Sequence, residues 1–245
     1  MLSGFSLLNL GRKLNMRVKS GIPGFDRLVQ GGFPAGSCIL LKGDSGVGKT
    51  IFGLQFCILS KDPAVFVSLN QSKESLLEQA SQFGWKPKKF SLLYLDPKDG
   101  IGYVYERIVR EIERNKAKRF VLDSLSVFTS YATVTSPKIT GPRGQVFKDL
   151  EALLSTRPSP GLFRVLTDTF INEIRKLGVT SILISEGLES DRAAEFSCDG
   201  IISLEAEVVG ERLERTIRVV KMRKTKIDGG RHSLEIGKKG IKVGS

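Results

Sequence analysis

The most constraining feature of the sequence is the stretch Gly43-Asp44-Ser45-Gly46-Val47-Gly48-Lys49-Thr50, which matches the pattern G-x-x-x-x-G-K-[ST] completely. A short apolar run, Ser37 to Leu41, precedes it, and an apolar helical segment, Thr50 to Ser60, follows it. A strand, a glycine-rich loop and a helix are the context that this phosphate-binding motif requires. The sequence therefore predicts a fold built around a strand whose carboxyl end holds phosphate groups.

The residue types of the motif indicate ATP and Mg²⁺ as ligands. Glycines let backbone N–H groups close around phosphate oxygens, and the helix that starts near Lys49 adds its positive dipole end. Lys49 supplies a point charge between the outer phosphates, and Thr50 offers a hydroxyl to Mg²⁺. Asp123 ends the buried run Phe120 to Leu122, where a carboxylate that holds Mg²⁺ through water is expected. The alternative role for Asp123 is to cap the following turn.

Apolar runs alternate with helical patterns along most of the chain, which predicts an α/β fold with a mostly parallel sheet flanked by helices. The expected strands before the last quarter of the chain are Ser37–Leu41, Ala64–Leu69, Leu92–Leu95, Phe120–Leu122 and Ser181–Ser185. The expected helices are Thr50–Ser60, a helix capped by Ser72 that runs to Phe83, Tyr103–Asn115 and Phe163–Leu177. Short strands at Ile201–Leu204 and Thr216–Lys221, with a closing hairpin at Ser233–Ile236 and Gly240–Val243, predict antiparallel C-terminal strands.

Two regions break this alternation. Residues 129–161 are rich in Thr, Ser, Pro and Gly, so we expect an insertion that serves as a binding element or a loop. It contains one helical pattern at Gln145 to Ser155, in which Val146, Leu150, Leu153 and Leu154 fall on one face. Residues 1–16 form an N-terminal tail whose role as an anchor, a partner segment or an artefact of start-codon choice stays open. Residues 17–245 are expected to form one domain.

Length and composition exclude several classes of protein. A chain of 245 residues with 40% apolar and 26% charged residues can bury a single large core, which excludes a disulfide mini-protein and a disordered chain. No run approaches the ~20 apolar residues of a membrane span, and no signal peptide is evident, so we expect a cytoplasmic protein. Three dispersed cysteines form no metal motif, and we expect them to be buried.

Beyond the phosphate motif, the chain resembles the RecA-superfamily ATPases, in particular KaiC-like proteins and archaeal RadA paralogues. The resemblance rests on Ser20-Gly21-Ile22-Pro23-Gly24-Phe25-Asp26-Arg27-Leu28 and on Gly31-Gly32-Phe33-Pro34-Ala35-Gly36-Ser37, which open the domain. It continues at Asp123-Ser124, Ile184-Ser185-Glu186, Asp199-Gly200-Ile201-Ile202 and Val220-Lys221-Met222-Arg223. The resemblance implies a RecA-like domain that binds ATP.

The chain departs from this family where the catalytic base is expected. In KaiC-like proteins two glutamates follow the second strand, and one of them orients or deprotonates the attacking water. This chain has Asn70-Gln71 there, and an amide cannot accept a proton. We expect ATP binding with slow turnover, unless Asn70 and Gln71 are a cap and a surface residue and the base lies elsewhere. Glu186 is the obvious substitute, provided that its strand lies beside the Asp123 strand.

Two cations near the C-terminus point to an oligomer. Lys221 and Arg223 alternate with Val220 and Met222, so they project from one face of a predicted strand. In KaiC-like assemblies the matching residues reach the terminal phosphate of the neighbouring subunit, which implies a ring or filament, for example a hexamer. The alternative is that both are ordinary solvated residues.

The sequence leaves two biological roles open. The net charge of +12, and Lys138, Arg143 and Lys148 in the insertion, favour a switch linked to DNA recombination or repair that binds single-stranded DNA. The alternative is a regulatory or scaffold ATPase that recruits a protein partner at residues 129–161. Asn70-Gln71 fits the second role, because a slow site holds its nucleotide state for longer.

Overall fold

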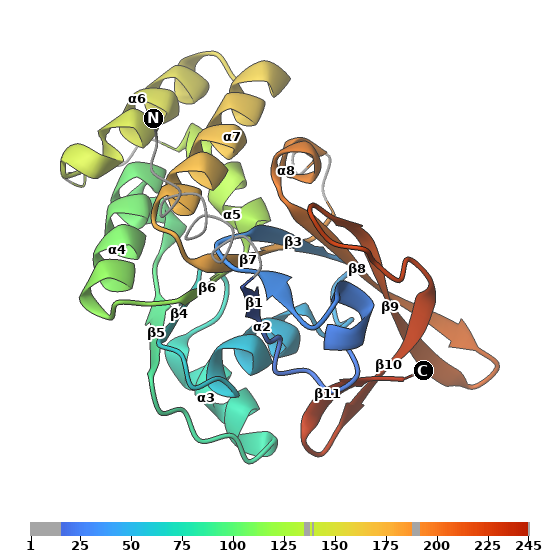
Figure 1. Ribbon diagram of the computed structural model, residues 1–245. Coiled ribbons are helices and arrows are strands. Elements are labelled where there is room, and N and C mark those ends of the chain that lie inside the picture. Colours follow the sequence, from blue (N-terminus) through green and yellow to red (C-terminus); the bar gives the residue numbers. More distant parts are fainter. Residues whose placement is uncertain (1–15, 135–137, 139, 188–191, 245) are drawn as a thin grey trace, which may run out of the picture.

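The protein is built on a nine-stranded sheet, seen in a computed structural model that describes residues 16–134, 138, 140–187 and 192–244. The strand order is β11-β10-β9-β8-β3-β7-β6-β4-β5 (Figure 1). Strands β8, β3, β7, β6, β4 and β5 run parallel, whereas β9, β10 and β11 are added antiparallel at the C-terminal side. The predicted mostly parallel α/β fold with antiparallel C-terminal strands is therefore confirmed.

Strands and helices alternate through most of the chain, as the apolar pattern predicts. The strands of the large sheet are β3 (Cys38–Lys42), β4 (Ala64–Ser68), β5 (Phe90–Tyr94), β6 (Arg119–Asp123), β7 (Thr180–Ser185), β8 (Gly200–Val209), β9 (Arg212–Met222), β10 (Arg231–Gly237) and β11 (Gly240–Val243), and β1 (Arg17–Val18) pairs with β2 (Phe33–Pro34). The helices are α2 (Lys49–Ile58), α3 (Lys73–Gln82), α4 (Ile101–Arg114), α5 (Leu125–Ser130), α6 (Gln145–Thr156), α7 (Pro160–Lys176) and α8 (Arg192–Ser197). Short 3-10 turns lie at Asp26–Val29, Pro97–Asp99, Tyr131–Thr133 and Pro142–Gly144.

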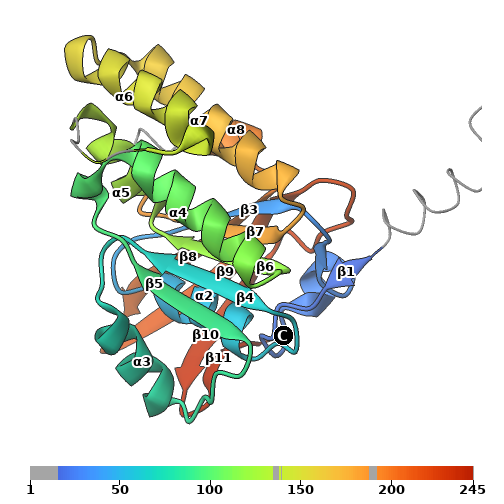
Figure 2. The same cartoon turned by 90° about the vertical axis from the view of Figure 1, so that its left-hand side faces the viewer.

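Helices cover both faces of the sheet, as Figure 2 shows, with α4, α6 and α7 on one face and α2 and α3 on the other. Side chains alternate across each strand, so Val121 of β6 joins the α2 core while Phe120 and Leu122 join the α4 core. Every residue of β4, β6 and β7 is buried, because a parallel strand covered on both faces has no solvent side. This burial holds the carboxyl ends of the strands together at one edge of the sheet.

Most predicted elements agree with the structure within one or two residues, but the C-terminal strands are longer than expected. The segments predicted as short strands are parts of β8 and β9, which span 10 and 11 residues and pair along their whole length. The outer end of β8 alternates apolar and charged residues from Leu204 to Val208, which is a strand pattern, but it contains no continuous apolar run of the kind on which the prediction was based. Val208 is 72% exposed and does not contribute to the core. The short helices α5 and α8 were also not predicted.

The helix within the predicted insertion is part of the core rather than an appendage. Phe147, Leu150 and Leu154 of α6 are buried and pack in the same cluster as Tyr105 and Phe170. The helical pattern placed Val146 and Leu153 on the apolar face with Leu150, but these two residues are exposed, because the buried face is centred closer to Phe147. Residues 135–137 and 139 of the insertion and residues 1–15 of the predicted tail lie outside the described residues.

Within the described part of the chain, no helix is both long and apolar enough to cross a bilayer. The three cysteines are free and buried, as the sequence predicted.

Candidate functional site

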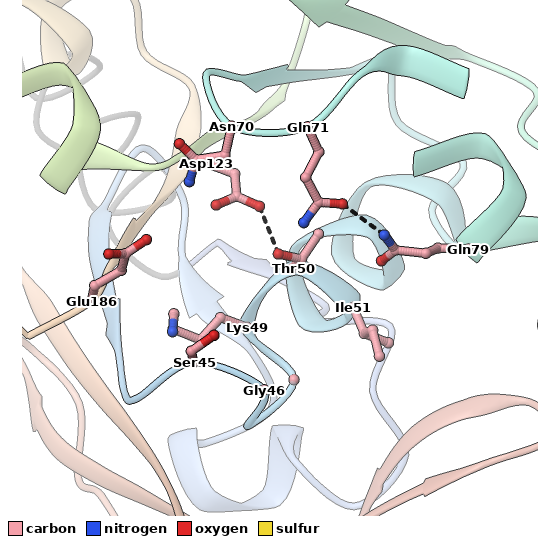
Figure 3. A pocket seen from close by; sticks show the side chains of 11 residues that line it. Ser45, Gly46, Lys49, Thr50, Ile51, Asn70, Gln71, Gln79, Asp123 and Glu186 are labelled. Atoms are coloured by element: carbon pink, nitrogen blue, oxygen red, sulfur yellow. Dashed lines mark hydrogen bonds between the residues drawn. The ribbon is translucent and has the colours of Figure 1, made fainter. Parts of the chain in front are cut away.

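The phosphate motif lies at the carboxyl ends of four parallel strands, beside a pocket of about 260 Å³ (Figure 3). The loop after β3 and the first turn of α2 form one wall, and residues at the ends of β4, β6 and β7 form the others. The lining residues are Ser45, Gly46, Gly48, Lys49, Thr50, Ile51, Asn70, Gln71, Gln79, Asp123 and Glu186. The predicted site residues that follow four different strands thus meet at one place, because strand ends in a parallel sheet share an edge.

The loop needs glycine at two of its positions. Gly48 has φ of +109° at the start of α2, a conformation that a side chain rarely adopts. A Cβ on Gly43 would lie 2.3 Å from the carbonyl oxygen of Leu204 on β8. Val47 is buried and anchors the loop in the core. The fixed backbone allows the loop N–H groups to face an anion at the helix N-terminus.

Lys49 places its charge inside the loop. Its side chain is buried, and Nζ donates hydrogen bonds to the carbonyl oxygens of Gly43 at 2.6 Å and Asp44 at 2.7 Å. Burial lowers the pKa of Lys49, and the nearby carboxylates of Glu186 and Asp123 act against that shift. The ammonium group is therefore fixed by the loop at the wall of the pocket, where it could bind the phosphates of a nucleotide.

Thr50 and Asp123 form a pair suited to a hard cation. Thr50 Oγ1 donates a hydrogen bond to Asp123 Oδ2 at 2.7 Å. Burial raises the pKa of Asp123 above its ordinary value, while the Thr50 hydrogen bond and the Lys49 charge oppose the rise. A hydroxyl and a carboxylate oxygen at this spacing fit Mg²⁺, which prefers few protein oxygens and keeps water ligands. The two residues would hold Mg²⁺ against the nucleotide phosphates.

Asn70 and Gln71 both line the pocket, at the end of β4. Their backbone N–H groups donate to Ser68 Oγ at 3.3 and 2.9 Å, which fixes the turn. Gln71 Oε1 accepts a hydrogen bond from Gln79 Nε2 at 2.7 Å. Gln79 was not predicted as a site residue. It lies on the side of α3 that faces the pocket, about two helical turns after the Ser72 cap. Amides thus occupy the wall of the pocket where the resemblance to KaiC-like proteins implies glutamates.

Glu186 meets the geometric condition for a substitute base. Its strand β7 pairs with β6, with Ile184 opposite Asp123, so Glu186 follows the strand adjacent to the one that ends at Asp123. The backbone N–H of Glu186 donates to Ser126 Oγ at 2.9 Å. Its side chain lines the pocket across from Thr50 (Figure 3). It is therefore one of two carboxylates that face the phosphate position.

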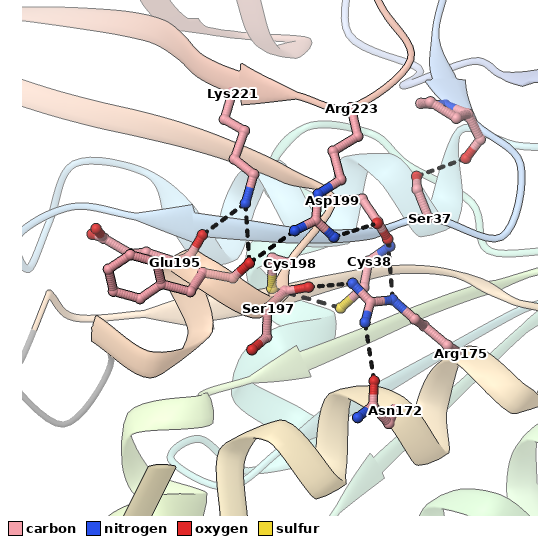
Figure 4. Close-up of polar contacts among 12 residues, drawn as sticks. Ser37, Cys38, Asn172, Arg175, Glu195, Ser197, Cys198, Asp199, Lys221 and Arg223 are labelled. Atoms are coloured by element: carbon pink, nitrogen blue, oxygen red, sulfur yellow. Dashed lines mark hydrogen bonds and ion pairs between the residues drawn. The ribbon is translucent and has the colours of Figure 1, made fainter. Parts of the chain in front are cut away.

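Lys221 and Arg223 are not part of this pocket; they lie at the C-terminal end of α8 (Figure 4). Lys221 Nζ donates to the carbonyl oxygens of Glu195 and Phe196 at 2.9 and 3.2 Å, and Arg223 Nη2 donates to that of Phe196 at 3.1 Å. Cations are favourable at a helix C-terminus, where carbonyl groups lack partners. Both side chains reach the same helix end, in agreement with the prediction that they share a face.

Arg223 also forms an ion pair, which was not predicted. Its Nη1 lies 3.4 Å from Asp199 Oδ1, while Arg175 Nε lies 3.2 Å from Asp199 Oδ2. Asp199 further accepts a hydrogen bond from the backbone N–H of Cys38 at 3.0 Å. No local pattern indicates this cluster, because Arg175, on α7, is distant in the chain. Arg223 remains half exposed despite these contacts.

The basic residues expected to contact DNA differ in their surroundings. Lys138 Nζ lies 2.6 Å from Asp99 Oδ2 and sits over the ring of Tyr103. Arg143 pairs with Glu113 on α4. Lys148 is exposed on α6. Two of the three cations therefore already balance carboxylates of the same chain.

Comparison with known proteins agrees with this geometry. The family model described as "ATPase: KaiC" matches residues 18–138 and 141–245. A UPF0273 protein of Aeropyrum pernix is 31% identical, with 93% of each chain covered. The circadian clock oscillator protein KaiC of Parasynechococcus marenigrum is 28% identical over 93% of this chain but 44% of the relative, so the chain spans less than half of that protein.

Solved structures show the same relationship. The crystal structure of a KaiC-like protein from Pyrococcus horikoshii superposes with a TM-score of 0.72 at 29% identity, and the match covers 94% of this chain and 99% of that one. The resemblance seen in the sequence motifs is thus confirmed by the family model, by relatives and by the fold. The phosphate loop, the paired Thr50 and Asp123 and these matches together establish that the chain belongs to the KaiC family of ATPases.

Proposed function

We propose that the protein binds ATP with Mg²⁺, hydrolyses it slowly and acts as an oligomeric switch whose state depends on the bound nucleotide. The observation that carries the proposal is the wall of amides, Asn70, Gln71 and Gln79, in a pocket that retains the complete phosphate loop. Binding groups are present, whereas the family's proton-accepting groups are replaced. Loss of a positioned general base typically lowers a rate by about 10²- to 10⁴-fold.

Glu186 is the proposed general base for ATP hydrolysis. In this proposal its carboxylate accepts a proton from the attacking water, and Gln71 orients that water through its amide. Asp123 Oδ2 accepts the hydrogen bond of Thr50, and in this proposal Asp123 would hold the cation, so the proton acceptor is assigned to the other carboxylate of the pocket. A carboxylate that acts from the β7 side instead of the β4 side is consistent with turnover that is slow rather than absent.

The decisive experiment is single-turnover hydrolysis of ATP by the wild-type protein and by Glu186→Gln, with nucleotide affinity measured in parallel. We expect the affinity to change by less than about threefold and the rate to fall at least about 10²-fold. Glu207→Gln, the same change at an exposed glutamate of β8 that does not line the pocket, is the matched control. If Glu186→Gln hydrolyses ATP at the full wild-type rate, Glu186 is not the base. A wild-type rate of about 10 s⁻¹, the median for enzymes, contradicts a slow switch.

The complete site would form between subunits. In this proposal Lys221 and Arg223 extend from the α8 end and reach the terminal phosphate of a neighbouring copy. The half-exposed guanidinium of Arg223 and the family resemblance support this role. A ring or filament, for example a hexamer, is the expected assembly.

A protein is the favoured partner of the switch. Val146 and Leu153 are 43% and 52% exposed on the outer side of α6, where they offer apolar contacts beside the polar rim of the helix. The ion pairs of Lys138 and Arg143 reduce the charge available for phosphates. The second candidate, a role in recombination or repair with single-stranded DNA, is supported by the net charge of +12.

One binding measurement separates the two partners. The double variant Val146→Ser with Leu153→Ser, and the variant Lys148→Glu, are tested for binding of a single-stranded oligonucleotide at low salt and for capture of cellular proteins with ATP or ADP. We expect weak oligonucleotide binding in every variant, and nucleotide-dependent protein capture that only the apolar double variant loses. Tight binding of the oligonucleotide that Lys148→Glu abolishes favours the DNA role instead.

A further inference from the structure

The two edges of the large sheet differ in how the rest of the chain covers them. At one edge, backbone groups of β11 are already hydrogen-bonded to other parts of the chain. Gln55 Nε2 donates to the carbonyl oxygen of Ile241 at 3.0 Å, and Gln55 Oε1 accepts from the N–H of Ile241 at 2.7 Å. The N–H of Val243 donates to the carbonyl of Pro23 at 2.8 Å. At the other edge, β5 pairs with β4 alone among the described strands. Natural sheets usually protect such an edge, so an open edge strand suggests a use.

Strand β5 presents backbone groups away from the sheet. The carbonyl of Lys89 accepts from Ala64, and the N–H of Leu95 donates to Ser68, so alternate residues from 89 to 95 face β4. By the period of two, Phe90, Leu92 and Tyr94 direct their N–H and carbonyl groups outward. The strand itself reads Phe-Ser-Leu-Leu-Tyr, without charge or proline. These are the properties of a strand that can accept another strand.

A groove of about 370 Å³ lies beside this edge and is lined by residues of α3, β5 and α4. Figure 2 shows the ribbon of β5 at the edge of the sheet, with α3 and α4 on either side of it. Leu77 of α3 and residues 90–93 of β5 line it, and most of these side chains are apolar. Leu77 is 38% exposed, and Tyr94 at the end of the strand is 47% exposed. The groove therefore combines an outward-facing row of backbone groups with partly exposed apolar side chains.

The rim of the groove is cationic. Lys73, Arg107 and Arg114 line it, and Glu111 is the acidic residue among the lining residues. Glu111 is buried, and its Oε1 accepts hydrogen bonds from Ser91, Asn115 and Arg114 within the chain. Exposed lysines also precede the strand, at positions Lys86, Lys88 and Lys89. An incoming segment would meet an excess of positive charge on both sides.

We infer that β5 is the docking site for an extended, acidic segment of a partner protein, which adds to the sheet as a further strand. Carboxylates on the segment match the cationic rim, and its apolar residues match Leu77 and the β5 side chains. A second copy of this chain is disfavoured by its own net charge of +12, and residues 1–15 contain no Asp or Glu. Nucleic acid would bind the cationic rim but would not pair with the outward backbone groups of β5. This surface is separate from α6 and goes beyond the proposed function.

The test uses a fluorescent peptide of about ten residues in which valine alternates with glutamate, and fluorescence anisotropy with the full-length protein. We expect saturable binding that a peptide with lysine in place of glutamate does not show. Methylation of alternate peptide nitrogens, which removes one row of donors, is expected to weaken binding at least about tenfold in one of the two registers. Hydrogen exchange at residues 90–94 is expected to slow on binding.

Variants of the protein provide the matched comparison. Tyr94→Pro removes an outward N–H where an edge strand tolerates proline, and it is compared with Tyr94→Ala, which loses the same side chain but keeps the donor. Lys73→Glu is compared with Lys118→Glu, an exposed lysine away from the groove. We expect at least about tenfold weaker binding for Tyr94→Pro than for Tyr94→Ala, and for Lys73→Glu than for Lys118→Glu.

Three results overturn the inference. The first is failure of the glutamate peptide to bind. The second is binding that is indifferent to nitrogen methylation and displaced by a single-stranded oligonucleotide, which would mark the rim as a nucleic-acid surface. The third is a fall in the solution mass of the protein in Tyr94→Pro without peptide, which would mark β5 as an interface between copies.

Discussion

The nucleotide pocket and the Lys221–Arg223 cluster both carry cations expected to meet a phosphate, yet their surroundings differ. In the pocket, Lys49 shares a cavity with Thr50 and Asp123, which are positioned by buried strands and the loops that follow them. In the cluster, Lys221 and Arg223 are bonded to carbonyl groups at the end of α8. Lys49 is likewise bonded to carbonyl groups of its own chain, but it lines the nucleotide pocket, whereas Lys221 and Arg223 lie outside that pocket.

We therefore expect the pocket residues to determine ATP affinity, and Lys221 and Arg223 to determine the rate of ATP hydrolysis. In the proposed function, a single copy holds the groups that bind the nucleotide and the cation, and a neighbouring copy supplies the cations that would stabilise charge developing on the outermost phosphate. Removing groups from the pocket should therefore weaken binding, and removing Lys221 or Arg223 should leave binding intact and slow the reaction. Four changes sharpen or break this contrast.

The largest effect is expected from the double variant Lys221→Ala with Arg223→Ala. Cations that reach a neighbour's phosphate can be worth about 10³- to 10⁵-fold in rate, so we expect turnover to fall at least about 10³-fold while ATP affinity stays within about threefold. Mixed oligomers of this variant with Lys49→Ala should regain activity, because one interface in such a mixture combines an intact loop with intact cations. Equal losses of affinity and rate would place both residues in ATP binding instead.

The second effect is the loss of ATP affinity in Lys49→Ala. Truncation of a buried, hydrogen-bonded charge that pairs with a ligand costs about 2 to 5 kcal/mol, so we expect ATP binding to weaken by roughly 30- to 4,000-fold, measured by calorimetry. Lys42→Ala is the control, because Lys42 is the last residue of β3, just before the phosphate loop, and forms an ion pair with Glu195. Unchanged affinity in Lys49→Ala would remove the pocket from nucleotide binding.

The third change restores an acid where the family has one. Gln71→Glu places a proton acceptor on the wall of the pocket, and Gln79 Nε2 can still donate to it. We expect the single-turnover rate to rise about tenfold or more, since a positioned base contributes about 10²- to 10⁴-fold. Glu78→Gln on the outer side of α3 serves as the control for altered charge. A rate that does not rise would show that turnover is limited elsewhere.

The smallest effect concerns stability. The pKa of Asp123 is raised in the folded protein, so ionisation of this carboxyl group opposes folding. The protonated carboxyl group adds to the free energy of unfolding below the pKa of the unfolded chain, and this contribution is lost as the pH rises through the pKa of the folded protein. Asp123→Asn should therefore raise the melting temperature at neutral pH by about 2 to 4 °C without nucleotide or magnesium, for a gain of about 1 kcal/mol. The gain should shrink as the pH falls toward the ordinary carboxyl pKa of about 4, and a lower melting temperature at neutral pH would contradict it.

Local patterns predicted most of the fold. Alternating apolar runs located the strands of the parallel core because each is buried on both faces, and Ser72 marked the start of α3, where its side chain accepts a hydrogen bond from the N–H of Ser75. The outer parts of β8 and β9 were not predicted, because pairing between two exposed strands leaves no apolar run. The buried face of α6 was shifted by about one residue, since its neighbours decide which of its apolar side chains are covered.

Residue order alone was enough to identify the phosphate loop and its ligand class, and it also led to the predictions of a magnesium pair and of missing catalytic glutamates, because each depends on residue type at a fixed position beside a strand. The neighbours of these groups emerge only when the chain is folded. Glu186 faces the pocket because β7 pairs with β6, Gln79 enters it because α3 packs beside the end of β4, and Arg223 meets Asp199 beside Arg175. Contacts between residues distant in the chain are set by strand order and helix packing, which no local pattern encodes.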